Sequence, residues 1–138
     1  MRPLEPATLV VIAVGGVIGA LARHAATIAL PQLWSTFVVN VTGCLLIGAL
    51  MAVVAGVPRA PRLLRPFLGV GVLGGFTTFS AYIVDIQQTL GEGRPFVAFA
   101  YLAITLVSAL AAVYAGGAVT TAVLGLVPPP AAEAEETP

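Results

Sequence analysis

Small and hydroxyl-bearing residues interrupt an otherwise apolar stretch of the sequence, GVLGGFTTFSAYIVD at 71–85. The interrupting residues are Gly74, Gly75, Thr77, Thr78 and Ser80. Glycine frees the backbone to leave helical geometry, and Thr and Ser hydroxyls compete for helical hydrogen bonds. A helix that unwinds and restarts here would present carbonyls to a cation and free N–H groups to an anion. The alternative is a continuous helix whose small residues serve close packing alone.

Two other apolar segments carry polar side chains along one helical face. Thr36 and Asn40 are spaced i, i+4 in the first segment. Tyr101, Thr105 and Ser108 are spaced i, i+4, i+7 in the second. An asparagine inside a membrane is costly without a polar partner. Asn40 therefore either joins two helices or lines a polar path.

Aromatic residues follow the interruption one helical turn apart, Phe79 and then Tyr82, with Asp85 next in line. Ring edges, hydroxyls and an amide suit a small anion that accepts hydrogen bonds. The polar face lacks the repeated Asp or Glu that cation pores commonly use. Arg23 either draws anions into a vestibule or extends its charge to the lipid headgroups. The pattern favours an anion path.

Charge-free runs indicate that these residues belong to membrane-spanning helices. The chain is 59% hydrophobic and 9% charged, with a mean hydropathy of +1.03. A helix needs about 20 mainly apolar residues to cross a bilayer, and no Asp, Glu, Lys or Arg occurs in 25–58, 66–84 or 95–132. We predict an all-α integral membrane protein with its third helix broken at mid-membrane. Its single domain (1–127) would contain helices at about 8–30, 33–56, 67–90 and 96–126, before a disordered tail at 128–138.

Charge and cysteine content limit the possible partners. The formal net charge is zero, which gives no indication of nucleic acid as a partner. Cys44 is the only cysteine, so an internal disulfide and a cysteine metal cluster are excluded, and we expect a small buried hydrophobic group. With four spans, most arginines would share one side with both termini, which favours cytoplasmic termini. These arginines are Arg2, Arg59, Arg62 and Arg65, with Arg94 opposite.

Three stretches resemble the small bacterial fluoride channel family, Fluc or CrcB: GGFTTFSAY (74–82), STFVVNVTG (35–43) and GGVIGALAR (15–23). The resemblance covers roughly residues 8–126. It implies a non-enzymatic, multi-pass protein of the bacterial inner membrane that exports fluoride passively and lowers cytoplasmic fluoride. It also implies an antiparallel, dual-topology homodimer with two pores. A structural sodium ion at the dimer axis would be held by the main-chain carbonyls of Gly74 and Thr77, with Gly74 supplying the backbone freedom.

The resemblance also implies which residues meet fluoride. Arg23 would lie in the vestibule. Tyr82 departs from the second phenylalanine of the family's TTFSTF pattern, and its added hydroxyl changes what the ion would meet. Together with the polar faces described above, the expected pore-lining residues are Thr36, Asn40, Thr78, Phe79, Ser80, Tyr82, Tyr101, Thr105 and Ser108.

Two other functions and one other assembly remain open from the sequence. A proton-coupled small multidrug-resistance exporter also has four helices, but it needs an acid deep in an early helix, and none follows Glu5 in the first segment. A non-transporting assembly factor fits the size but leaves the polar faces unexplained. The arginine bias argues against perfectly balanced insertion, so the lipid-embedded dimer could pair this chain with an oppositely oriented homologue.

Overall fold

The computed structural model describes residues 5–56 and 61–125, and they are helical almost throughout. The elements are α1 (Pro6–Ala29), α2 (Gln32–Gly56), η1 (Arg65–Leu73), α3 (Gly74–Phe76), α4 (Phe79–Gly91) and α5 (Pro95–Leu124). Four helical segments of this part of the chain are long and apolar enough to cross a membrane, as the sequence predicted, with Arg65–Gly91 counted as one. The predicted disordered tail at 128–138 lies outside the described residues, as do Arg2 and Arg59.

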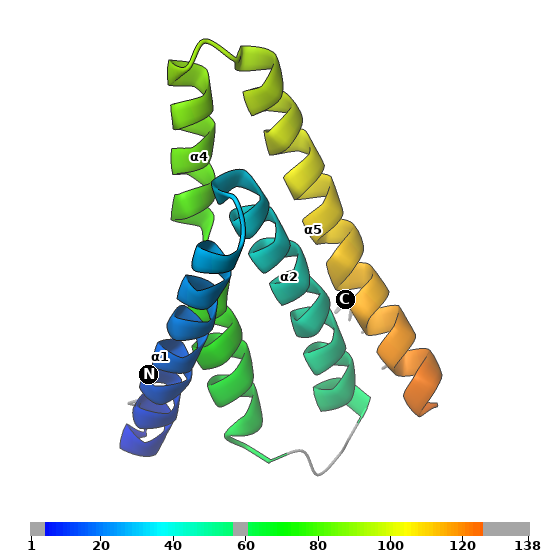
Figure 1. Ribbon diagram of the computed structural model, residues 1–138. Helices are drawn as coiled ribbons and strands as arrows, with labels where there is room; N and C mark the ends of the chain where they lie inside the picture. The colour runs from blue at the N-terminus through cyan, green and yellow to red at the C-terminus, as the bar shows by residue number, and fades with distance from the viewer. Residues whose placement is uncertain (1–4, 57–60, 126–138) are drawn as a thin grey trace, which may run out of the picture.

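The start of α1 and the end of α5 lie at the same end of the bundle (Figure 1). At that end Arg62 forms an ion pair with Glu5 at 2.6 Å, and the neighbouring carboxylate raises the pKa of the Arg62 guanidinium. Arg94 lies in the α4–α5 turn at the opposite end, where it pairs with Glu92 at 3.3 Å. The described part of the chain therefore crosses the bundle an even number of times.

Most large apolar side chains face outward. Val10, Leu21 and Phe96 are among many large hydrophobic residues that are exposed, whereas only a few apolar residues are buried. One buried cluster joins α4 to α5 through Tyr82 and Ile86. This distribution is the reverse of a water-soluble core, because lipid is itself an apolar environment. It suits a bundle whose outer surface contacts hydrocarbon.

Glycines bring α1 into backbone contact with η1 and α3. A Cβ atom added at Gly15 would lie 2.6 Å from the carbonyl oxygen of Phe67 and 3.0 Å from the Cα of Gly71. A Cβ atom at Gly75 would overlap the carbonyl oxygen of Gly16. Such close approach replaces side-chain packing between helices in lipid. The segment that leads into the interruption is therefore held firmly against α1.

The third apolar segment begins with a π-helix, η1, which the sequence pattern does not predict. Its wide turns are visible in the hydrogen bond from the Gly74 N–H to the carbonyl of Gly69, five residues earlier. π-Helical turns are rare and often occur near functional sites. Here the wide turns lead directly to α3 and the residues that follow it.

Helical geometry stops at Thr77 and Thr78, which separate α3 from α4. Thr77 has φ −75° and ψ 157°, and Thr78 has φ −150° and ψ 122°, so both are extended. Gly74 has φ −66° and ψ −36°, a right-handed helical conformation that any residue can adopt. The expectation that Gly74 supplies the backbone freedom is therefore wrong, because the chain departs from the helix three residues later.

Candidate functional site

Asn40 of α2 clamps the extended backbone between α3 and α4. Its Oδ1 accepts a hydrogen bond from the Thr78 N–H at 2.8 Å, and its Nδ2 donates to the Thr78 carbonyl at 2.9 Å. The Thr78 N–H requires an acceptor and the Thr78 carbonyl requires a donor, so the two hydrogen bonds together fix the orientation of the Asn40 side-chain amide. Only one of the two Nδ2 hydrogens is used by this clamp. Both sequence interpretations of Asn40 are therefore compatible: it joins two helices and keeps a donor.

The Thr78 side chain caps the restarted helix α4. Its Oγ1 accepts a hydrogen bond from the Ala81 N–H at 3.2 Å and lies 3.3 Å from the Ser80 Oγ. A threonine at this position satisfies one of the amide groups that a helix N-terminus leaves unpaired. Because the hydroxyl accepts from Ala81, its own hydrogen stays available to Ser80 or to an ion.

Two carbonyls beside the interruption lose their usual helical partners. In a continuous helix the Thr78 and Ala81 amides would donate to the carbonyls of Gly74 and Thr77, four residues earlier. Here these amides donate instead to Asn40 and to the Thr78 side chain. The Thr77 hydroxyl donates to the Leu73 carbonyl at 2.9 Å, so it does not replace the amide donors that the carbonyls of Gly74 and Thr77 have lost.

Arg23 of α1 reaches the same segment. Its Nε donates to the Gly75 carbonyl at 3.2 Å, and the side chain is half-buried. The guanidinium thus contacts the C-terminal end of α3, where helical carbonyls carry partial negative charge. Arg23 therefore lies next to the interruption.

A hollow of about 240 Å³ lies between α2, the start of α4 and α5, and we call it the Asn40 hollow. Its lining residues are Asn40, Cys44, Thr77, Thr78, Phe79, Tyr82, Thr105, Leu106 and Ala109. Thr105 is only 4% exposed, and its Oγ1 makes no hydrogen bond of normal geometry with the described residues. Ser108 and Ser80 do not line this hollow; Ser108 is half-buried on α5, and Ser80 is exposed at the start of α4.

Aromatic rings form one wall of the Asn40 hollow. Phe79 is 74% exposed and its ring centroid lies 5.9 Å from that of Tyr82. Tyr82 is 8% exposed and donates its hydroxyl to the Leu102 carbonyl of α5 at 2.7 Å. Tyr82 stands where the family pattern has a second phenylalanine. Its additional hydroxyl binds α5, and its ring is left to face the hollow.

Thr36 lies in a second hollow of about 370 Å³, which we call the Asp85 hollow. Its lining residues are Thr27, Ser35, Thr36, Ala81, Val84 and Asp85. Tyr101 lies beside Thr36 and Asp85 on this side and beside Thr105 and Tyr82 on the other. Its hydroxyl makes no hydrogen bond of normal geometry with the described residues. Tyr101 therefore lies between a lining residue of each hollow, Thr36 and Thr105.

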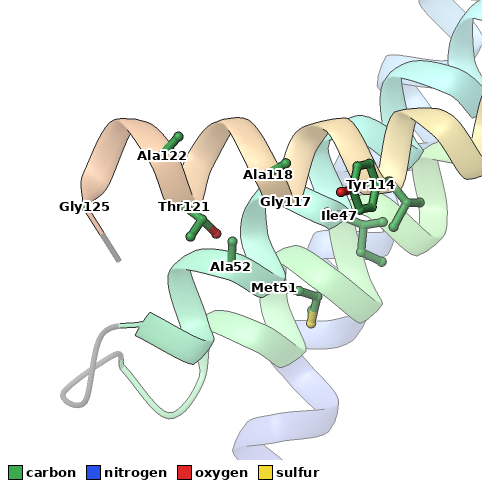
Figure 2. Close-up of a pocket in the computed structure, with 11 residues that line it drawn as sticks. Ile47, Met51, Ala52, Tyr114, Gly117, Ala118, Thr121, Ala122 and Gly125 are labelled. Atoms are coloured by element: carbon green, nitrogen blue, oxygen red, sulfur yellow. The ribbon is translucent and has the colours of Figure 1, made fainter. Parts of the chain in front are cut away.

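A larger hollow, of about 810 Å³, lies elsewhere. Figure 2 shows it between the C-terminal halves of α2 and α5, where small residues such as Ala52, Gly117 and Ala118 form its walls. Thr121 and Tyr114 are its only hydroxyl-bearing lining residues. Because few polar groups converge there, we place the candidate site at the smaller Asn40 hollow.

Sequence reasoning missed Cys44 as a site residue. We expected a small buried hydrophobic group, but Cys44 is half-buried and lines the Asn40 hollow. The signal was present, because Cys44 follows Asn40 by four residues and so lies on the same helical face. Leu106 and Ala109 were also missed, since apolar wall residues have no chemical signature in a sequence.

Comparisons with known proteins agree with this architecture. A family model described as "CrcB-like protein, Camphor Resistance (CrcB)" matches residues 10–117. The chain is 54% identical over 101 residues to "Fluoride-specific ion channel FluC 2" of Streptomyces avermitilis, covering 70% of this chain and 64% of that protein. It is 50% identical over 119 residues to "Fluoride-specific ion channel FluC 2" of Nocardia farcinica, covering 83% and 85%. It is 40% identical over 111 residues to "Fluoride-specific ion channel FluC" of Azotobacter vinelandii, covering 76% and 90%. The chain is therefore a multi-pass membrane protein that belongs to the CrcB family.

Proposed function

We infer that this protein is a fluoride-specific ion channel and not an enzyme. The observation that carries the inference is the Asn40 hollow, which a spare Asn40 amide hydrogen borders together with the aromatic rings of Phe79 and Tyr82. The relatives named above as fluoride-specific channels support the same function. The alternative of a proton-coupled multidrug exporter has no support from these relatives, and α1 carries no acidic residue.

Hydrogen-bond donors in the hollow are suited to replace the water around fluoride. Fluoride accepts hydrogen bonds, and a pore must replace its hydration without binding it too tightly. Asn40 supplies an amide N–H, while the edges of Phe79 and Tyr82 carry partial positive charge. No acidic residue is among the lining residues of the Asn40 hollow. An anion there would meet donors and little repulsion.

The restarted helix adds a fixed positive potential. α4 runs for 13 residues from Phe79, so its N-terminus carries the partial positive charge of aligned peptide dipoles. Arg23 contributes a full positive charge at the neighbouring Gly75 carbonyl. Both features would raise the local concentration of an anion beside the hollow. We assign Arg23 to this role at the approach to the path.

We further propose that the Thr77–Thr78 interruption lies at mid-membrane and that Tyr101 connects the two hollows along the path. Non-helical backbone is tolerated in a bilayer where it is buried or lines a cavity. Thr36 would continue the path on the Asp85 side of Tyr101. Ser108 has a weaker case, since it lies outside both hollows.

The proposed assembly is an antiparallel homodimer in the bacterial inner membrane. Phe79 lines the Asn40 hollow yet remains 74% exposed, so one chain leaves this wall open to a neighbour. An antiparallel partner would cover it and give two equivalent paths. Pairing with an oppositely oriented homologue would meet the same requirement, and crosslinking of singly expressed protein distinguishes the two assemblies.

A sodium ion at the dimer axis fits the carbonyls of Gly74 and Thr77. Their usual amide donors are bound elsewhere, which leaves oxygen lone pairs of the kind that hard cations prefer. When bound, the ion would supply a structural link between subunits. Arg23 places a positive charge nearby, so several carbonyls would be needed to stabilise a second cation.

Fluoride efflux from liposomes containing the purified protein tests the proposed function. Vesicles loaded with potassium fluoride should release fluoride when valinomycin carries potassium, and vesicles loaded with potassium chloride should retain chloride. Chloride release at a comparable rate would contradict the selectivity, and absence of fluoride release would contradict the function.

A further inference from the structure

Cys44 faces the Asn40 hollow from α2, one helical turn beyond Asn40. The adjacent Gly43 packs so closely on the Thr77 side chain that a Cβ atom at Gly43 would overlap the threonine methyl group. This contact fixes the rotation of α2 about its axis at that level. The Cys44 side chain is consequently held on the face that borders the hollow.

The walls of the hollow indicate what occupies it. Thr105 of α5 is 4% exposed, and its hydroxyl lies against Tyr101. Asn40 keeps one Nδ2 hydrogen that its hydrogen bonds to Thr78 do not use, so the hollow is expected to hold an occupant that accepts a hydrogen bond from it. Water and a hydrated or partly hydrated anion both meet this requirement. Either occupant would also contact Cys44.

We propose that Cys44 is a pore-lining residue whose thiol borders the fluoride path between Asn40 and Thr105. This inference rests on the proposed channel function and deepens it. The thiol is small and is a weak hydrogen-bond donor, so it narrows the path without binding an anion strongly. With Leu106 and Ala109 forming the rest of the wall, added bulk on the sulfur would obstruct a hollow of about 240 Å³.

Modification of the folded protein with methyl methanethiosulfonate tests the proposal. The Cys44 thiolate attacks the methylthio sulfur, an S–S bond forms, the bond to the sulfonyl sulfur breaks, and methanesulfinate leaves with the electron pair. The thiol proton is released to water. Because the reagent acts after folding, a loss of flux cannot result from misfolding during synthesis. Intact-mass spectrometry measures the extent of modification, with a denatured sample as the reference for a reactive thiol.

The untreated protein should release fluoride, and complete modification should reduce that rate at least tenfold. The Cys44→Ser variant should keep its own untreated rate after the reagent. Adding Leu46→Cys to that variant places a thiol on an exposed position of α2 outside the hollow, and its modification should not change the rate.

Two results would overturn the proposal. One is full modification of Cys44 with unchanged fluoride release. The other is a Cys44 thiol that reacts only after denaturation, since a residue bordering the path must be reachable in the folded protein. Absence of fluoride release from untreated protein would instead refute the proposed channel function.

Discussion

Replacing Asn40 with aspartate changes one of the two atoms that contact the Thr78 backbone. The Thr78 N–H can still donate to a carboxylate oxygen, but the Nδ2 donor to the Thr78 carbonyl becomes a second oxygen. The carbonyl then faces an acceptor in place of a donor, and the clamp loses one of its two hydrogen bonds. The substitution also places a negative charge at the Asn40 hollow.

Both effects can be sized. An unsatisfied buried carbonyl costs about 1–3 kcal/mol, which would loosen the segment between α3 and α4 without unfolding the bundle. Two like charges about 4 Å apart repel by about 4 kcal/mol at an effective dielectric constant of about 20. Since every 1.4 kcal/mol is a factor of about ten, fluoride occupancy should fall by on the order of a thousandfold. We expect fluoride efflux to fall by at least a hundredfold.

The matched control is Gln87→Glu, which makes the same amide-to-carboxylate change at an exposed position of α4. Both variants would be compared by fluoride efflux from liposomes, after size-exclusion chromatography has established the same assembly as the unmodified protein. Cys44→Ala is not a neutral comparison, because Cys44 lines the same hollow. If correctly assembled Asn40→Asp protein conducts as well as the Gln87→Glu protein, Asn40 lies outside the fluoride path.

Three further predictions concern stability and the role of each hydroxyl. Gly75→Ala should lower the melting temperature in detergent, because the added methyl group would overlap the α1 backbone at an overpacking cost of about 1–3 kcal/mol. Gly74→Ala should be tolerated, and equal losses of melting temperature in the two variants would contradict the described packing. Tyr82→Phe should lower the free energy of unfolding by about 1 kcal/mol, because the hydrogen bond to the Leu102 carbonyl is lost, and it should keep fluoride efflux. A large loss of efflux would show that the Tyr82 hydroxyl contacts the ion. Thr77→Val should lower the free energy of unfolding by about 0.5–1.5 kcal/mol, because the hydrogen bond from the Thr77 hydroxyl to the Leu73 carbonyl is lost. The variant should still form the dimer in crosslinking, and loss of the dimer would mean that the Thr77 hydroxyl, and not its carbonyl, is needed for assembly.

Much of the helical architecture could be predicted because it depends on local composition. Three charge-free runs and the apolar N-terminal segment predicted four helical spans, and the described part of the chain has four segments that are long and apolar enough. Thr77, Thr78 and Asn40 could be singled out as candidate residues because they are polar groups in otherwise apolar segments, but the contact between Asn40 and Thr78 was not predicted. Polar side chains in such segments must find partners, and here the Asn40 side chain binds the extended backbone of Thr78.

The rest depended on how each helix is rotated about its axis, which single residues do not determine. Gly74 looked like the essential glycine, but Gly75 is the one that faces α1. Ser108 shares a helical face with Thr105 on paper, yet the hollow is completed by other residues of α5. The Arg23 contact with Gly75 joins residues 52 positions apart, so it arises only when α1 packs against α3.

Current measurement across a planar bilayer containing the purified protein tests the central claim of passive fluoride conduction most directly. With a fluoride gradient and a separate pH gradient, the current should reverse at the equilibrium potential for fluoride and should not move when the pH gradient is inverted. A reversal potential that follows the pH gradient would indicate coupling to protons. A reversal potential that follows chloride would contradict the donor-lined Asn40 hollow as a fluoride-selective path.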